Sequence, residues 1–342
     1  MTLPDYPKFK ACAAHVAPIF LDAAATVEKA CSLIAEAASN GAKLIAFPES
    51  YVPGFPVWAS IQAPIKNHNF FKQLADNSIA VPGPEVTQLC QTARDGAIVV
   101  SIGISERSAV SVGALWNSNL LIDANGIIVN HHRKLVPTFY EKLIWSSGDG
   151  AGLRVSDTPI GKLGMLICGE NTNPLARYSL IAQGEQVHVS SYPPVWPTRP
   201  SNEPGRYDLA SAIRIRTGAH SFEGKVFNVV TSAFLDNKTL DALNGIDREA
   251  RATLEQSPQA VSMVIGPSGE VISDTLCEVE GLLYQQIDIS HCVEPKQFHD
   301  VVGYYNRFDV FDLRVNRKRI VPITFSDDDG NDGVEPSGQE PI

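Results

Sequence analysis

The sequence lacks long apolar runs and has no excess of positive charge, and each absence excludes a class of function. No segment reaches the roughly 18 consecutive apolar residues of a membrane-spanning helix, and charges interrupt the N-terminal residues, so we expect no signal peptide. Lysine and arginine together number 28 against 38 acidic residues, which gives a net charge of -10. Nucleic acids and anionic membranes bind basic surfaces. We therefore expect neither a nucleic-acid partner nor a membrane partner.

Cysteine is also scarce, with six in 342 residues and no C-x-x-C spacing. A disulfide scaffold and a structural zinc site both need more closely placed cysteines, so a reducing, cytoplasmic location is predicted. The glycine-rich signatures of nucleotide and dinucleotide sites are missing, as are the H-E-x-x-H and G-x-S-x-G motifs. We expect neither a metal nor an organic cofactor.

Apolar residues make up 44% of the sequence, which is enough for a sizeable core. They are arranged in alternating strand and helix patterns. Strands are expected at 9–16, 43–47, 97–105, 115–123, 127–132, 153–156, 162–168, 186–190, 226–232, 261–265, 271–273 and 281–287. Helices are expected at 23–40, 67–80, 85–95, 174–183 and 207–223. This alternation is typical of an α/β fold with mixed sheets.

The chain divides into one domain and a C-terminal extension. No linker interrupts residues 1–290, which we predict to fold as one unit. Residues 291–325 change character and are predicted to lie at a subunit interface; residues 235–256, which show no core partner, are a second candidate interface. The tail at 326–342 holds six acidic and no basic residues, so we predict a disordered, solubilising segment.

Three residues of different chemistry each end a predicted strand. Glu49 follows the strand at 43–47, and Lys134 follows that at 127–132. Cys168 ends the strand at 162–168, six residues before a proline that can open a helix. Ligand sites of α/β sheets gather at strand ends. A carboxylate among apolar neighbours can act as a base, a lysine can stabilise developing negative charge, and a cysteine near a helix start is favoured as a thiolate. Singly, each residue has a plainer interpretation, as a solvated glutamate, an exposed lysine or a core cysteine; together they point to nucleophilic catalysis.

The residues around these positions resemble the nitrilases over a region from about residue 8 to 311. The matching segments are AFPESYVPGFP at 46–56, HRKLVPT at 132–138, EKLIW followed by GDG at 141–150, and CGENTNPLAR at 168–177. The resemblance implies a four-layer α-β-β-α sandwich, with residues 1–290 forming a carbon–nitrogen hydrolase domain. It also implies homo-oligomers, as dimers that stack into spirals or helical filaments.

By the same resemblance the catalytic residues are Glu49, Lys134 and Cys168, with Glu141 as a second glutamate. The implied reaction converts a small-molecule nitrile into the carboxylic acid and ammonia through a covalent thioimidate and an acyl-enzyme. No cofactor is needed. An aliphatic amidase with the same residues, a hydratase-like enzyme that stops at the amide, a cyanide-hydrolysing enzyme and a non-catalytic scaffold stay open as alternatives.

One departure bears on specificity. Many nitrilases have tryptophan after the nucleophile, whereas this chain has Gly169. The change resembles nitrilases that favour aliphatic nitriles, of an aliphatic or broad-range type. Further candidate substrate-binding residues are Tyr51, Trp58, Tyr192 and Trp196, each of which is equally compatible with core packing.

Overall fold

Two mixed sheets form the centre of the fold in the computed structural model, which describes residues 6–321 and 323. The first sheet has the strand order β11-β1-β2-β3-β4-β5 and the second has the order β10-β9-β8-β7-β6. The first contains β1 (Lys8–His15), β2 (Ala42–Ala46), β3 (Val99–Arg107), β4 (Leu115–Ile122), β5 (Ile128–Arg133) and β11 (Gly281–Asp288). The second contains β6 (Ser156–Thr158), β7 (Gly161–Ile167), β8 (Val187–Tyr192), β9 (Phe227–Ser232) and β10 (Met263–Ile265).

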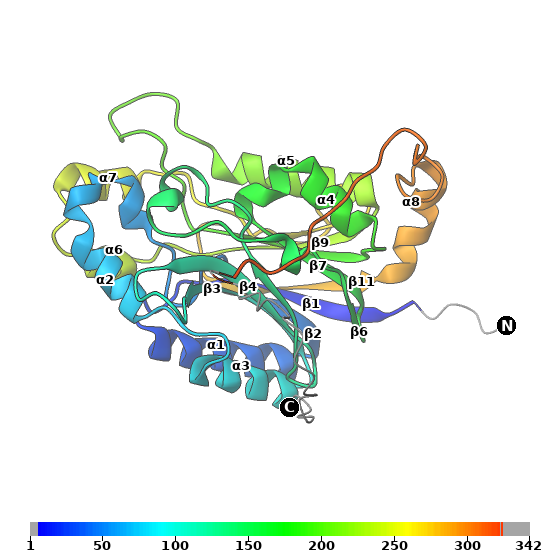
Figure 1. Ribbon diagram of the computed structural model, residues 1–342, viewed down its shortest axis with the longest axis horizontal. Coiled ribbons are helices and arrows are strands. Elements are labelled where there is room, and N and C mark those ends of the chain that lie inside the picture. Colours follow the sequence, from blue (N-terminus) through cyan, green and yellow to red (C-terminus); the bar gives the residue numbers. More distant parts are fainter. Residues whose placement is uncertain (1–5, 322, 324–342) are drawn as a thin grey trace, which may run out of the picture.

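Helices cover the outer face of each sheet (Figure 1). Strands β1, β2 and β3 run parallel, and α1 (Ala23–Ser39) and α3 (Pro84–Asp95) connect them, packing side by side beneath the first sheet. The Asp22 side chain caps α1 by accepting a hydrogen bond from the backbone N–H of Ala25. Strands β7, β8 and β9 are likewise parallel, and α4 (Pro174–Ile181) and α5 (Leu209–Gly224) cover that sheet. The predicted four-layer sandwich is confirmed.

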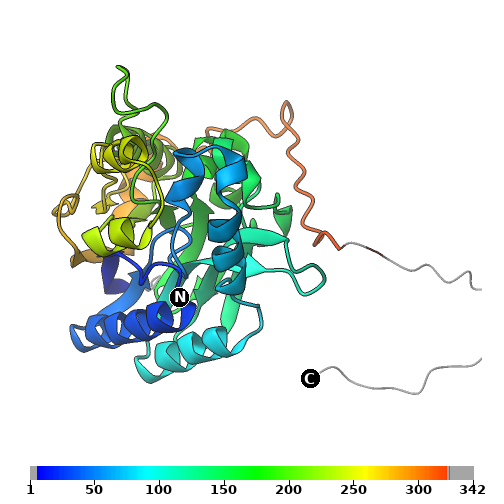
Figure 2. The same ribbon diagram turned by 90° about the vertical axis from the view of Figure 1, so that its left-hand side faces the viewer.

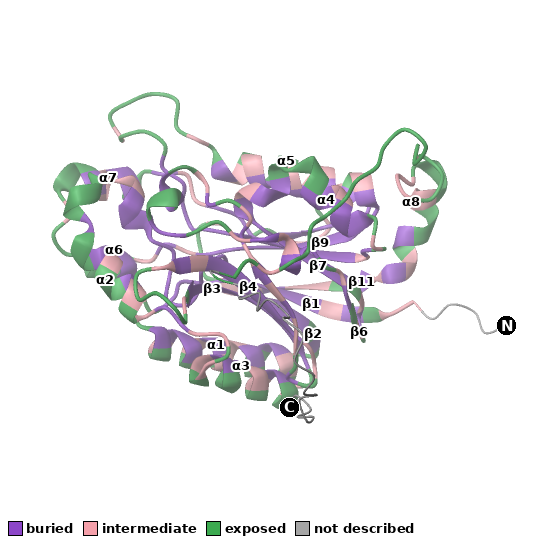
Figure 3. Cartoon of the chain, in the orientation of Figure 1, coloured by how far each residue is buried: buried purple, intermediate pink, exposed green. Residues whose placement is uncertain are grey.

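The core lies in the two helix–sheet layers and between the sheets (Figure 3). Successive strand residues point to opposite faces, so in β8 Val187 and Val189 pack between the sheets while His188 and Ser190 face the helices. Both faces of this strand are buried, as is usual for parallel strands covered on two sides. The site described below lies where one apolar cluster reaches the ends of both sheets.

Several predicted elements are wrong in place or kind. The strand at 153–156 is displaced to β6, and 271–273 forms only an isolated bridge from Val271 to Ile265. The helix at 67–80 is α2 (His68–Asp76), and short 3-10 turns at Val57–Ser60 and Pro64–Lys66 interrupt the loop before it. Residues 235–256 are not an unpacked loop. They form α6 (Asn237–Ala242) and α7 (Arg248–Glu255), and bury Leu240, Leu243 and Leu254 in the core.

After β11 the chain leaves the sandwich and returns along its side. A 3-10 turn at Ile289–Cys292 buries Cys292 in the core two residues past the predicted domain boundary, and α8 (Val293–Phe298) follows. The remaining stretch, orange to red in Figure 2, descends along the body, where Arg319 and the N–H of Ile320 bind the Asp149 carboxylate. The acidic tail at 326–342 lies outside the described residues. Among the described helices, none combines the length and apolarity needed to cross a bilayer.

Candidate active site

Glu49 lies at the carboxyl end of β2, in a turn whose backbone packs closely against the neighbouring strand β3. The next residue, Ser50, has a left-handed backbone with φ 47°, a conformation that non-glycine residues adopt at a cost of about 1–3 kcal/mol. A Cβ at Gly103, on neighbouring β3, would stand 2.2 Å from the Pro48 carbonyl and 2.5 Å from the Ser50 nitrogen. Glycine at 103 therefore lets the turn pack against β3. Glu49 is completely buried there.

Lys134 follows β5 and its side chain lies between two carboxylates. Its Nζ is 2.6 Å from Glu49 Oε1, and 2.6 and 2.9 Å from the two oxygens of Glu141. Its backbone N–H continues the β4–β5 ladder by donating to the Asn117 carbonyl at 2.8 Å. All three charged side chains are fully buried. The three hydrogens of the ammonium group are thus occupied by carboxylate oxygens.

Glu141 is held by a capping box at the start of a 3-10 turn, Phe139–Leu143. Its carboxylate accepts a hydrogen bond from the N–H of Thr138 at 3.0 Å, and the Thr138 side chain accepts one from the N–H of Glu141. Phe139 has a left-handed φ of 50°. Ser50 and Cys168 share this conformation, so three residues of the site have a left-handed backbone. Such strain gathers where the surrounding structure enforces a functional geometry.

One cation between two buried carboxylates leaves a net negative charge, which the pKa values reflect. Burial raises the pKa of Glu141 to about 7, with Lys134 opposing the shift and Glu49 adding to it. Burial acts to lower the pKa of Lys134, but the two glutamates outweigh it and raise that pKa above its ordinary value. Lys134 is consequently charged at neutral pH, while Glu141 takes up a proton more readily than an exposed glutamate does.

Cys168 begins a 3-10 turn, Cys168–Thr172, directly after β7, with φ 48°. The side chain is buried, and the charges of Glu49 and Lys134 act on its thiol. Burial raises the pKa of Cys168 well above the ordinary value, and the Glu49 charge raises it further, while Lys134 opposes the shift. Burial and Glu49 together outweigh Lys134, so the raised pKa favours a thiol at rest rather than the thiolate expected at a helix start.

A third carboxylate, which the sequence analysis did not single out, joins the lysine and cysteine segments. Glu170 accepts hydrogen bonds from the backbone N–H groups of Leu135 at 2.5 Å and Ile167 at 2.8 Å, and lies 2.9 Å from His132 Nε2. Burial acts to raise the pKa of Glu170, but His132 and these donors outweigh it and lower the pKa. An ionised Glu170 thus fixes the residue after Lys134 relative to the residue before Cys168.

The candidate substrate-binding residues separate into two groups. Trp58, Tyr192 and Trp196 belong to the same buried cluster as Cys168. Tyr51 packs in another cluster, on Phe47 and beneath α1. The Cα of Gly169 faces Thr138, whose Oγ1 would lie 2.8 Å from an added Cβ.

Two further residues of the site were missed by sequence reasoning. Asn117 donates from Nδ2 to Glu49 Oε1 at 2.7 Å, and Tyr140 stacks on Trp196 with ring centroids 4.5 Å apart. The sequence feature that could have indicated Asn117 is the Asn125-Gly126 turn. This turn sets the pairing of the two hairpin strands and places residue 117 opposite Lys134. The second oxygen of Glu49, Oε2, is buried and has no hydrogen-bond partner.

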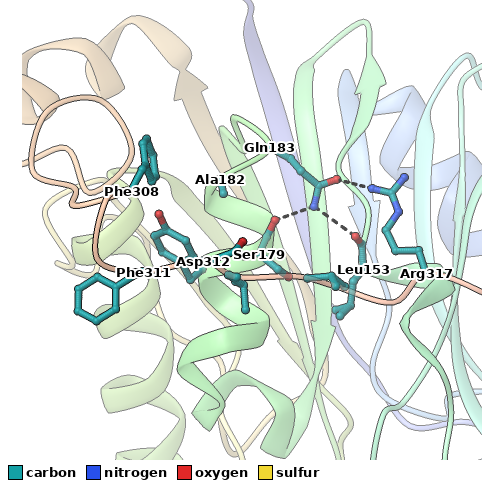
Figure 4. Close-up of a pocket in the computed structure, with 11 residues that line it drawn as sticks. Leu153, Ser179, Ala182, Gln183, Phe308, Phe311, Asp312 and Arg317 are labelled. Carbon is teal, nitrogen blue, oxygen red and sulfur yellow. Dashed lines mark hydrogen bonds between the residues drawn. The ribbon is translucent and has the colours of Figure 1, made fainter.

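A cavity of about 510 Å³ lies away from these residues, where the C-terminal stretch crosses α4 (Figure 4). Phe308 and Phe311 stand on one side of it, and Gln183 connects the two segments by accepting a hydrogen bond from Arg317 at 3.3 Å. Its lining contains none of Glu49, Lys134 and Cys168, so this cavity is separate from the buried cluster.

Among the residues that the structure describes, one trio of potential metal ligands lies close together. Glu185, His188 and His220 are buried, with Nδ1 of His188 and Nε2 of His220 lying 2.6 and 2.7 Å from the carboxylate oxygens. Two ligands of one tetrahedral zinc ion, each about 2.0–2.1 Å from the metal, stand about 3.3 Å apart. The observed separations are those of hydrogen bonds, so a shared proton fits this trio and a metal does not.

Comparisons with known proteins agree with this geometry. Residues 11–297 match the carbon–nitrogen hydrolase family. The chain is 35% identical to an aliphatic nitrilase of Rhodococcus rhodochrous, covering 92% of this chain and 84% of the relative, and 32% identical to a nitrilase of Paraburkholderia phymatum, covering 94% and 90%. A carbon–nitrogen hydrolase structure from Helicobacter pylori superposes with a TM-score of 0.69 at 19% identity, covering 89% of this chain and 97% of that one.

Proposed function

The chain belongs to the carbon–nitrogen hydrolase family, in its nitrilase branch, and from this premise we propose that it hydrolyses an organic nitrile to the carboxylic acid and ammonia. The nucleophile is Cys168, the base is Glu49, and Lys134 stabilises developing negative charge. Glu141 is a positioning residue that orients Lys134. The observation that carries the proposal is the buried Glu49–Lys134–Glu141 cluster beside a left-handed cysteine.

The first step is the addition of the thiol to the nitrile. Because the pKa of Cys168 is raised by burial, the thiol needs a base at the moment of attack. Glu49 is suited to this role, since Oε1 is occupied by Lys134 and Asn117 while Oε2 has no partner. As sulfur bonds to the nitrile carbon, the thiol proton passes through Glu49 to the nitrile nitrogen and gives a thioimidate.

Two water molecules complete the reaction. Glu49 deprotonates the first, which adds to the thioimidate carbon, and ammonia leaves from the tetrahedral intermediate to give a thioester. The second water cleaves the thioester, releasing the carboxylic acid and restoring the thiol. The Lys134 hydrogens are all directed at carboxylates, so the substrate competes with Glu141 for one of them as charge develops.

For the substrate class we propose an aliphatic nitrile, with Gly169 and the aromatic residues Trp58, Tyr192 and Trp196 forming its surroundings. Gly169 puts no side chain next to the nucleophile, and three aromatic side chains in the Cys168 cluster offer apolar contact. The similarity to an aliphatic nitrilase supports the same class.

The test measures ammonia and product identity for aliphatic, aryl and arylacetonitriles and for the matching amides. Wild type is compared with Cys168→Ala and with Cys292→Ala, a matched control that removes a buried thiol elsewhere in the core. Carboxylate and ammonia from nitriles, lost only in Cys168→Ala, support the proposal. Turnover of amides alone, amide as the only product, or retained activity in Cys168→Ala refutes it.

We further propose that the protein is a homo-oligomer, built from dimers that stack into spirals, with residues 291–325 contributing to an interface. The outer helical layer exposes the apolar side chains of Leu175 on α4 and of Ile215 and Phe222 on α5, which an interface would remove from water. Light scattering that reports a monomer at all working concentrations would refute self-association. The cytoplasmic location stays a prediction, supported by six free cysteines.

A further inference from the structure

A buried histidine behind the nucleophile has no part in the chemistry proposed above. His188, on β8, faces the helical layer and is fully buried, as are Glu185 and His220 beside it. The rings of His188 and His220 stack with centroids 3.9 Å apart. Gly164 on adjacent β7 makes room for this group, because a Cβ there would stand 2.0 Å from Glu185 Oε1. The space is shaped for a carboxylate and two imidazoles.

A chain of hydrogen bonds runs from this group to the backbone of Cys168. His188 Nε2 lies 3.0 Å from Asn171 Oδ1. The Asn171 amide nitrogen donates to the carbonyl of Cys168 at 3.1 Å and to that of Leu166 at 3.2 Å. Asn171 thereby closes the turn in which Cys168 adopts its left-handed conformation. The other end of this amide, Oδ1, faces His188 Nε2 and also accepts a hydrogen bond from Ser190 Oγ at 3.1 Å.

The donors and acceptors determine where the protons are. Two carbonyl oxygens face the nitrogen of the Asn171 amide, so the amide cannot be turned over without opposing acceptor to acceptor. Its Oδ1 is therefore the acceptor, and the facing Nε2 of His188 carries a hydrogen. The other ring nitrogen, Nδ1, is 2.6 Å from Glu185, whose pKa is lowered to about 2 because its two histidine neighbours outweigh burial. An ionised carboxylate only accepts, so Nδ1 also carries a hydrogen.

His220 completes the assignment as the neutral partner. Its Nε2 lies 2.7 Å from the second oxygen of Glu185, while Nδ1 is buried without a hydrogen-bond partner. Burial, and then the charge on His188, lower the pKa of His220. A neutral ring protonated on Nε2 satisfies both observations, and a second imidazolium stacked on the first would add charge repulsion.

We propose that His188 is a buried imidazolium, held by Glu185, and that it is the positioning residue that sets the Cys168 turn through Asn171. Its two ring hydrogens span the gap between a carboxylate and an amide oxygen, which a neutral imidazole cannot do. The positioning role rests on the proposed function, because Cys168 must be the nucleophile for its placement to matter.

The protonation state is tested by nuclear magnetic resonance on the full-length protein labelled with ¹⁵N-histidine, in the solid state if the assembly is large. The signals are assigned by their loss in His188→Gln and His220→Gln. We expect two ring N–H protons on His188 and one on His220 at pH 7.5. A single ring proton on His188 overturns the proposal. This measurement needs no substrate, so its outcome is separate from that of the nitrilase assignment.

Kinetics test the positioning role. In His188→Leu we expect kcat to fall about 10- to 100-fold with KM nearly unchanged, because a nucleophile displaced by about 1 Å costs a factor of that size. In Glu185→Gln we expect near wild-type kcat: the new amide donates to Nδ1, so a neutral His188 still donates to Asn171. In this variant, His188 should also carry one ring proton instead of two.

The matched control is His15→Gln. His15 is equally buried, and its two ring nitrogens have partners of their own in Ser262 and the Cys277 carbonyl. This change is expected to lower stability and leave kcat intact. Wild-type kcat in His188→Leu, or a fall in Glu185→Gln as large as in His188→Leu, overturns the positioning role. If His188→Leu does not fold, Asn171→Ser replaces it, and wild-type kcat there has the same meaning.

Discussion

Replacing Lys134 with methionine is expected to lower the melting temperature by roughly 4–7 °C at pH 8. The change leaves Glu49 and Glu141 buried without their cation, and removing one partner of a buried ion pair costs about 3–5 kcal/mol. Unfolding entropy is about 2.1 cal/mol/K per residue, or about 0.7 kcal/mol/K for the 342 residues, which converts that cost into the stated shift. Methionine keeps the length and apolar volume of the lysine stem, so the missing charge dominates.

The deficit should shrink as the pH falls. Without Lys134, burial disfavours the charged form of both carboxyls, whereas the unfolded chain ionises them above a pKa of about 4.3. The penalty is therefore absent where both states are protonated, grows above the unfolded pKa, and is complete above the folded pKa. Calorimetry at pH 8 and pH 5, at one protein concentration, measures both effects.

The control is Lys162→Met, which removes an exposed ion pair with Asp157 at 2.9 Å. Exposed pairs contribute about 0–1 kcal/mol, so its melting temperature should stay within about 1.5 °C of wild type. A Lys134→Met protein that melts within 2 °C of wild type at pH 8, or whose deficit is equal at pH 5, would refute the account of the cluster.

Three further outcomes are expected. Gly169→Ala should reduce kcat, because the new Cβ would lie 2.8 Å from Thr138 Oγ1, whose capping bond holds Glu141. The control Gly113→Ala, whose new Cβ meets nothing within 4 Å, should keep the wild-type kcat. Equal kcat values in the two variants would contradict this reasoning. Since burial raises the pKa of Glu141 to about 7, kcat/KM should rise through pH 7 as the carboxylate ionises, and this limb should be absent from the residual activity of Glu141→Gln; an unchanged profile would exclude Glu141 as its source. Ile215→Asp, on the exposed face of α5, should shift the light-scattering mass downward; an unchanged mass would place the interface elsewhere.

Much of the architecture could be predicted because it is local. Asp22 caps the first helix, Asn125-Gly126 closes a hairpin, and apolar strands alternate with amphipathic helices. The short helices α6 and α7 were missed because six to eight residues are too few to show a helical period, and their apolar residues acquire meaning only from the core that covers them.

By itself the sequence determined that Glu49, Lys134 and Cys168 end separate strands, since strand ends are readable from apolar runs and their terminators. Only the tertiary structure decided what those residues are to each other. Lys134 lies between two carboxylates that are 85 and 7 residues away, and burial makes Cys168 a thiol where the local pattern indicated a thiolate. Distances across the chain and the loss of water set charges and protonation states, and neither quantity is a property of a local segment.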